Sequence, residues 1–143
     1  MSKTSQLVSR LFAREPPPLE PGTKLWAPEL KREIAGLQEH RYVIAALHLA
    51  NDDIDSCHLI AQDNEGDPTA DLLHATLHRR EGDYWNSKYS ISTHPLCNRA
   101  EAKAFVDKCE AAQRRSDDDD APLRQRQWDE LKTLVEWTRA NCK

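Results

Sequence analysis

The sequence predicts an all-helical protein in which antiparallel helical hairpins are stacked and a C-terminal helix caps the stack. The main observation is an internal echo with a period of thirty residues. Residues 45–48 read Ala-Ala-Leu-His and lead to Asp53. Residues 75–78 read Ala-Thr-Leu-His and lead to Asp83. Tandem helical hairpins leave such an echo because each hairpin buries its apolar face only against a neighbouring hairpin.

The composition is a second observation, and it favours helices over a turn-rich β architecture. The chain has 143 residues, of which only 4 are glycine, and it is rich in Ala, Leu, Glu, Arg and Gln. These residue types, glycine apart, are good helix formers. Because 38% of the residues are hydrophobic, the chain has enough apolar material for one compact core.

Charge and cysteine usage limit the partners and the compartment. The formal net charge is -4, whereas a non-specific nucleic-acid binder needs a surplus of Lys and Arg on one face. We therefore expect no nucleic-acid partner, and no membrane partner either. The four cysteines form no C-x-x-C pair, and no secretory apolar segment precedes them. Reduced thiols in an intracellular, cytoplasmic protein are the simplest interpretation.

Residues 1–25 are expected to form an amphipathic helix and a proline-rich linker ahead of a single helical domain, residues 26–143. The apolar residues of the helix share one face: Leu7, Val8, Leu11 and Phe12. Its charges are all basic up to residue 14, so a mitochondrial presequence is one interpretation. The alternative is a helix that docks this apolar stripe on the domain. Residues 15–22 contain four prolines and are expected to be extended.

The remaining helices follow from apolar periodicity and from the residues at their ends. Pro28 suits the first turn of a helix that carries Leu30, Ile34 and Leu37. Further helices are predicted at 42–50, 54–62, 69–80, 84–92, 98–114 and 123–141. Glycine followed by aspartate ends one helix and caps the next at two places. The acidic run at 116–122 is predicted to be a solvated loop, because its like charges repel one another and a proline stands at its end. A calcium site is the alternative, but the run lacks the ligand spacing of a calcium-binding loop.

Residues 74–95 resemble a tetratricopeptide helical hairpin. The residues that carry the resemblance are small Ala75, turn Gly82, aromatic Tyr84, small Ser87 and terminal Pro95. The copy at 45–60 is similar, with Asp52 at the place of the turn glycine. Residues 77–89 also resemble a group of uncharacterised fungal and bacterial proteins, which adds no activity. The tetratricopeptide resemblance implies a stacked-hairpin scaffold that binds a protein segment.

Two histidines suggest a metal site. His74 and His78 are four residues apart, and Asp71 and Glu81 lie three residues outside them, so all four share one helical face. Two imidazoles and a carboxylate can bind zinc or another divalent ion and leave a position open for water. A metal-dependent, hydrolase-like enzyme would then use Glu81 or Asp83 as its general base.

A structural interpretation of the same histidines stands beside the metal site. His48 is the counterpart of His78 in the other copy of the echo, and a residue type that recurs at equivalent positions can belong to the scaffold. The counterpart of His74 is Ile44. The other histidines, at positions 40, 58 and 94, are expected to be surface or capping residues.

A third pattern is a set of basic and aromatic side chains around the second turn. Guanidinium groups beside aromatic rings are typical of grooves that hold a carboxylate, a phosphate or an acidic peptide. The expected ligand-binding residues are His74, Arg79, Arg80, Trp85 and Lys88. The plain alternative is that Arg79 pairs with Asp83 and that Trp85 fills the core.

Three hypotheses for function follow from these patterns. The first is a binding scaffold that docks a protein segment or a small anionic ligand and needs no cofactor. The second is a metal-dependent enzyme that uses His74, His78 and either Glu81 or Asp83. The third is a homodimer in which apolar stripes pair helix against helix.

Overall fold

The computed structural model describes residues 1–116 and 119–143, and these residues form an all-helical fold, as predicted. The helices are α1 (Lys3–Phe12), α2 (Leu30–Ala35), α3 (Arg41–Ala50), α4 (Ile54–Gln62), α5 (Pro68–Arg80), α6 (Tyr84–Ser90), α7 (Arg99–Arg114) and α8 (Ala121–Asn141). The described residues contain no strand, only an isolated β-bridge between His94 and Cys97. None of the helices described is both long and apolar enough to cross a membrane.

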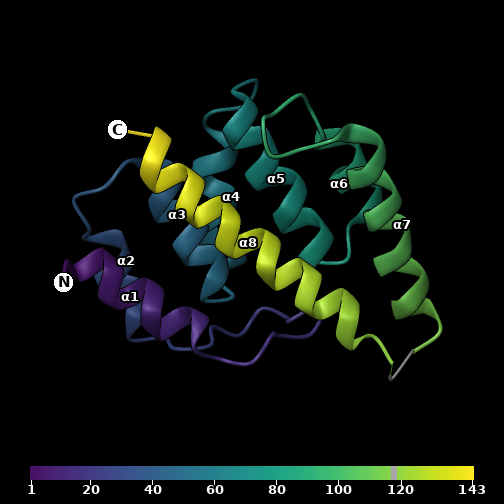
Figure 1. Ribbon diagram of the computed structural model, residues 1–143, viewed down its shortest axis with the longest axis horizontal. Coiled ribbons are helices and arrows are strands. Elements are labelled where there is room, and N and C mark those ends of the chain that lie inside the picture. The colour runs from purple at the N-terminus through teal and green to yellow at the C-terminus, as the bar shows by residue number, and fades with distance from the viewer. Residues whose placement is uncertain (117–118) are drawn as a thin grey trace.

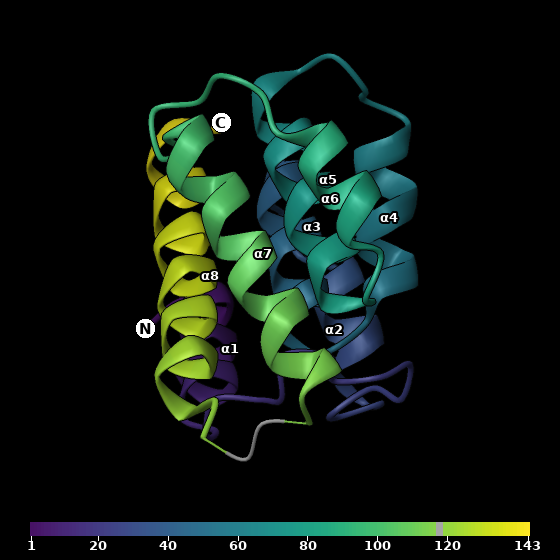
Figure 2. The same cartoon turned by 90° about the vertical axis from the view of Figure 1, so that its right-hand side faces the viewer.

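Consecutive helices pack side by side along the middle of the chain. Helix α3 packs against α4, α4 against α5, and α5 against α6, while α7 follows on α6. Helix α8 then returns to pack on α3 and crosses the front of the molecule diagonally (Figure 1). Figure 2 shows α8 and α1 on one side of the molecule and α4 on the opposite side. The C-terminal helix therefore lies on the side of α3 that faces away from α4.

The thirty-residue echo is a repeated turn between helices. Asp52 ends the first turn with φ 62° and Gly82 ends the second with φ 80°. The backbone N–H of Asp53 and that of Asp83 each donate to the carbonyl five residues earlier, at 2.9 Å in both cases. Both aspartates then accept a hydrogen bond from the backbone N–H three residues later, at 3.2 Å and 3.3 Å. The two copies share this local geometry because an aspartate caps the following helix in both.

Helix α1 docks its apolar stripe on the rest of the fold. Leu7 and Leu11 are buried in the main core cluster, which also contains side chains of α2, α3, α4, α5 and α8. The ring of Phe12 lies 4.6 Å from that of Trp128 on α8. The docked alternative for residues 1–14 is thus the arrangement that the structure adopts.

The proline-rich segment 15–22 contains no helix, but the chain bends at Leu19 and Glu20 rather than staying extended, and it packs as a strap along the helices. Leu19 is buried against Phe105 and Cys109 of α7. The side-chain amide of Gln127 donates to the carbonyl of Leu19 at 3.2 Å. Glu20 accepts hydrogen bonds from two helices further along, at 3.0 Å and 2.7 Å. This segment therefore ties the sixth, seventh and eighth helices together.

The acidic loop predicted at 116–122 lies partly outside the described residues, which omit positions 117 and 118. Helix α7 ends at Arg114 and α8 begins at Ala121. The end of α7 agrees with the prediction, whereas α8 begins two residues before the predicted start at Leu123, because Pro122 fits the first turn of a helix.

Candidate functional site

Helix α5 presents different chemistry on three of its faces, because residues three or four positions apart share a face of a helix. The face toward α3 and α4 is fully buried and consists of Leu73, Leu77 and Arg80. A second face lines a cavity and consists of Leu72, Ala75, Thr76 and Arg79. The third face carries the two histidines predicted to bind metal.

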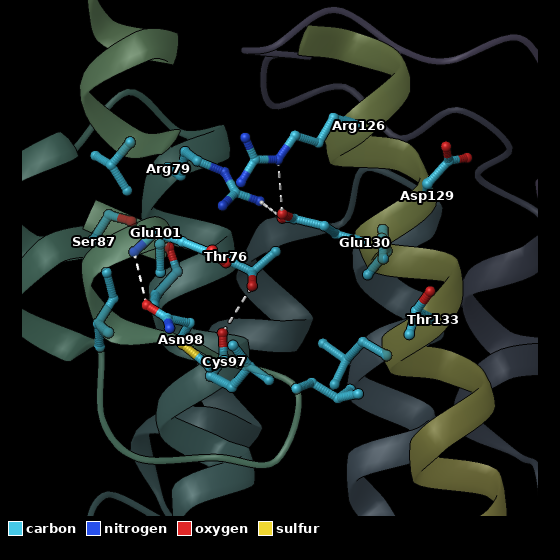
Figure 3. A pocket seen from close by; sticks show the side chains of 18 of the residues that line it. Thr76, Arg79, Ser87, Cys97, Asn98, Glu101, Arg126, Asp129, Glu130 and Thr133 are labelled. Carbon is cyan, nitrogen blue, oxygen red and sulfur yellow. Dashed lines mark hydrogen bonds and ion pairs between the residues drawn. The ribbon is translucent and has the colours of Figure 1, made fainter. Parts of the chain in front are cut away.

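The cavity lies between α5, α7 and α8 and has a volume of about 660 Å³ (Figure 3). This volume falls in the range of about 300–1,000 Å³ that is typical of small-molecule sites. Much of its wall is apolar, with side chains from four helices or their connecting segments: Leu72, Ala75, Ile91, Val106, Leu131 and Leu134. An apolar ligand body would lose water-exposed surface in this cavity.

Two guanidinium groups meet at one end of the cavity. Arg79 on α5 and Arg126 on α8 both approach the carboxylate of Glu130, at 3.3 Å and 3.4 Å. Figure 3 shows both guanidinium groups pointing toward this carboxylate. Both also lie over the ring of Phe105, at 4.6 Å and 4.0 Å from its centroid. One carboxylate therefore balances two cations, which leaves a local positive charge at this end.

Arg79 is held firmly, whereas Arg126 and Glu130 are accessible. Arg79 is buried, and its Nε donates to Oε1 of Gln127 at 2.8 Å. The side chains of Arg126 and Glu130 are 42% and 43% exposed. An incoming anion can therefore reach the pair of arginines by displacing or joining Glu130.

The histidines form a separate cluster between α4 and α5. The rings of His74 and His78 are stacked with centroids 4.5 Å apart, and His58 on α4 lies 4.9 Å from the first and 5.6 Å from the second. One nitrogen from each of the three rings lies within 4.8 Å of the others. His58 was expected to be a surface or capping residue, but it faces the two predicted ligands.

Glu81 and Asp83 both face His78. Nδ1 of His78 lies 2.5 Å from Oε1 of Glu81 and 3.8 Å from Oδ2 of Asp83. Burial lowers the pKa of His74, and the neighbouring rings of His78 and His58 lower it further. This histidine is therefore neutral at pH 7, the form that binds metal ions. Glu81 is engaged with the imidazole, so it is placed to orient His78 rather than to act as a free base.

The structural interpretation of the repeated histidine also has support. Nδ1 of His48 lies 3.7 Å from Oδ2 of Asp53, which matches the distance from His78 to Asp83. His48 and His78 thus occupy equivalent places beside their turns. The first copy has Ile44 where the second has His74, so only the second copy gathers histidines.

The five residues predicted to form an anion-binding groove do not come together. Arg80 is fully buried and pairs with Asp52 at 2.9 Å. Lys88 on α6 pairs with Asp107 at 2.8 Å, and this hydrogen bond raises the pKa of Lys88. Trp85 is 69% exposed, so the alternative that it fills the core is wrong.

The predicted groove therefore does not exist as one site, and its residues lie in separate places. Trp85 stacks on Tyr89 with ring centroids 5.3 Å apart. Arg79 lines the cavity, where it contacts Glu130 rather than the expected Asp83, while His74 belongs to the histidine cluster. Arg126 and Glu130 were not predicted, because nothing in their spacing shows that α8 returns across α5.

Comparison of the chain with protein-family models, with curated proteins and with solved structures finds no match.

Proposed function

We propose that the protein is a binding scaffold of tetratricopeptide-like helical hairpins that holds a small amphipathic anion in the cavity between α5, α7 and α8. The observation that carries the proposal is the pair Arg79 and Arg126, which share the single carboxylate of Glu130 at the end of an apolar cavity. A ligand with an apolar body and a carboxylate or phosphate head matches this arrangement.

The charge at the arginine end supports an anionic head group. Guanidinium groups bind carboxylates and phosphates through two parallel hydrogen bonds, and such charge-assisted bonds are stronger than neutral ones. Two other acids, Glu101 and Asp129, also line the cavity. Asp129 accepts a hydrogen bond from Gln125 at 2.8 Å, and Figure 3 shows its carboxylate turned away from the arginines. Asp129 therefore does not neutralise the two arginines.

Binding rather than covalent catalysis suits the polar groups at this site. Cys97 lines the cavity, but burial raises the pKa of its thiol. At neutral pH this thiol is protonated and is a poor nucleophile. The cavity thus offers an apolar wall, two guanidinium groups and a protonated thiol.

Octanoate and octanol provide a test, because they differ in the head group and share an eight-carbon chain. We expect isothermal titration calorimetry to detect octanoate binding with one site per chain, and octanol to bind at least tenfold more weakly. This factor corresponds to about 1.4 kcal/mol, the low end for a hydrogen bond to a charged group. Equal affinity for the two compounds would remove the anion-binding part of the proposal.

Matched variants locate the bound octanoate. Arg126→Gln is expected to weaken octanoate binding about tenfold, whereas Arg124→Gln on the same helix, away from the cavity, leaves it unchanged. Ala102→Phe fills the cavity and is expected to abolish binding of both compounds. Ala104→Phe, at an exposed position of α7, is the control. Binding that survives Ala102→Phe would show that the ligand sits elsewhere.

A further inference from the structure

The three imidazoles between α4 and α5 differ from ordinary scaffold histidines in the state of their nitrogens. A structural imidazole normally satisfies both ring nitrogens with hydrogen bonds. Nε2 of His74 is buried, and it has no hydrogen-bond partner among the residues described. Leaving such a group unpaired is costly, so an additional partner is expected at this nitrogen.

We propose that His58, His74 and His78 form a binding site for one divalent transition-metal ion of the zinc class. Helix α5 supplies two imidazoles one turn apart, and α4 supplies the third. This set differs from the ligand set predicted from the sequence, in which Glu81 completed the site with His74 and His78. The proposal does not depend on ligand binding in the cavity, because the cavity uses another face of α5.

Glu81 takes the role of an orienting carboxylate in this site. A histidine that binds zinc usually donates its other ring N–H to a carboxylate, which fixes the tautomer and raises the basicity of the ligand nitrogen. Oε1 of Glu81 lies 2.5 Å from Nδ1 of His78. Nε2 of His78 is then the nitrogen left for the ion.

The geometry requires a small contraction of the cluster. Zinc–nitrogen bonds of about 2.0 Å in a tetrahedral arrangement place the nitrogens about 3.3 Å apart, whereas the present nitrogens lie within 4.8 Å of one another. The side chain of His58 is half-buried and makes no hydrogen bond within the described part of the chain. Its side chain can therefore rotate toward the two histidines of α5.

The expected chemistry of the bound ion follows from the ligand set. Three neutral imidazoles leave the full charge of the ion uncompensated, and a tetrahedral zinc ion keeps a fourth position for water. Soft thiolate ligands are not part of the site, which favours zinc, cobalt and nickel over copper(I).

The test is titration of protein purified without a histidine tag. We expect calorimetry with Zn²⁺ to give one ion per chain, and Co²⁺ to give a visible spectrum of tetrahedral intensity without a sulfur-to-cobalt charge-transfer band. His58→Gln and His74→Gln are each expected to weaken Zn²⁺ binding at least 100-fold. Glu81→Gln is expected to weaken it 10-fold to 100-fold, as is typical for loss of a carboxylate behind a ligating histidine.

His40→Asn is the matched control, because His40 lies outside the cluster and asparagine can keep its capping role at the start of α3. This variant should bind Zn²⁺ as the wild type does. Circular dichroism of each variant establishes that it is folded, and half-buried His58 is the substitution least expected to disturb the fold. Lack of a stoichiometric ion in the wild type, unchanged affinity in folded His58→Gln, or a cobalt spectrum dominated by sulfur would each overturn the proposal.

Discussion

The carboxylate of Asp52 holds the guanidinium group of Arg80 at 2.9 Å in the interior of the protein. Asp52 also accepts a hydrogen bond from Arg14, the residue that follows the first helix and its cap, at 3.0 Å. The pair thus links the turn after α3 to the end of α5 and to the N-terminal segment. Burial lowers the pKa of Arg80 to about 10, so the guanidinium group is still charged at pH 7.

Removal of this guanidinium group should destabilise the fold strongly. Arg80→Ala leaves the buried carboxylate of Asp52 with one cation instead of two, and breaking a buried pair costs about 3–5 kcal/mol. Arg114→Ala is the control, because Arg114 pairs with Glu110 at the surface and its side chain is 77% exposed. Such a surface pair contributes about 0–1 kcal/mol. Urea unfolding followed by circular dichroism compares the two, and equal losses would contradict the role assigned to Arg80.

Replacement of Gly82 by alanine should cost more stability than replacement of Gly66, another glycine with a similar backbone conformation. Gly66 and Gly82 both have positive φ, at 94° and 80°, and alanine in this region costs about 1–2 kcal/mol. A Cβ at position 82 would also collide with the carboxylate of Glu20, whereas position 66 has open space. We therefore expect Gly82→Ala to lower the free energy of unfolding more than Gly66→Ala.

A double variant separates backbone strain from the collision. In a Glu20→Ala background, the cost of Gly82→Ala should fall to that of Gly66→Ala, because only the strain remains. If the two glycines were equally tolerant in the wild-type background, Glu20 would not be held where the structure places it.

Stability should decline in mild acid. Burial lowers the pKa of His48, His74 and His94 below the ordinary value of 6.5. The unfolded chain therefore takes up these protons at a higher pH than the folded protein does. The free energy of unfolding is expected to be at its highest above pH 6.5. It should fall as the pH drops toward the lower pKa values of the folded state. Each histidine contributes at most about 1.4 kcal/mol per pH unit.

The contribution of His94 to this pH dependence of stability can be measured separately. Nδ1 of His94 accepts a hydrogen bond from the backbone N–H of Leu96 at 3.0 Å, and a proton on Nδ1 would break it. His94→Asn should flatten the decline in stability between pH 6.5 and pH 5, measured by urea unfolding with a chelator present. A slope that is unchanged by this substitution would contradict the assignment.

The four free cysteines should divide into two partly accessible and two fully protected thiols. Cys57 and Cys109 are buried, and burial raises the pKa of their thiols to about 12 and about 11. Cys97 and Cys142 are half-buried. A disulfide reagent is expected to modify the second pair in the folded protein and the first pair only after unfolding.

Octanoate should protect one of the two half-buried thiols from the disulfide reagent. Cys97 lines the proposed binding cavity and Cys142 lies at the end of α8, away from it. We expect saturating octanoate to slow modification of Cys97 and leave Cys142 unaffected, with Cys97→Ser and Cys142→Ser used to assign the two rates. Equal slowing of both thiols would indicate a general effect of the fatty acid rather than occupancy of the cavity.

The exposed aromatic pair on α6 should contribute little to stability. Trp85 and Tyr89 are 69% and 77% exposed, and surface substitutions usually change stability by less than about 0.5 kcal/mol. Trp128 is buried in the main core, where truncation to alanine costs about 3–5 kcal/mol. Thermal unfolding of Trp85→Ala and Trp128→Ala compares the two positions, and a large loss in the first would place Trp85 in the core after all.

The helices could be predicted because their signals are local. Asp53 and Asp83 cap the helices that follow them, and both turns were identified from a few consecutive residues. The site residues depend on packing between distant segments. His58 meets His74 only because α4 lies against α5, and no sequence spacing reveals that contact.

The errors at the arginines have the same origin. Adjacent residues on a helix are rotated by about 100°, so Arg79 and Arg80 face different surroundings. Arg79 reaches the cavity and Arg80 enters the core. A sequence pattern that treats neighbours as one basic patch cannot separate them, and the buried partner at Asp52 becomes visible only in three dimensions.

The hydrogen bond from Gln127 to the carbonyl of Leu19 spans 108 positions of the chain. A ribosome adds about 5–20 residues each second, so Leu19 is synthesised roughly 5–20 seconds before Gln127 exists. During that interval the strap can contact α6 and α7, but the carbonyl of Leu19 lacks the hydrogen bond that α8 supplies. Complete packing of the N-terminal strap therefore requires that the last helix has been synthesised.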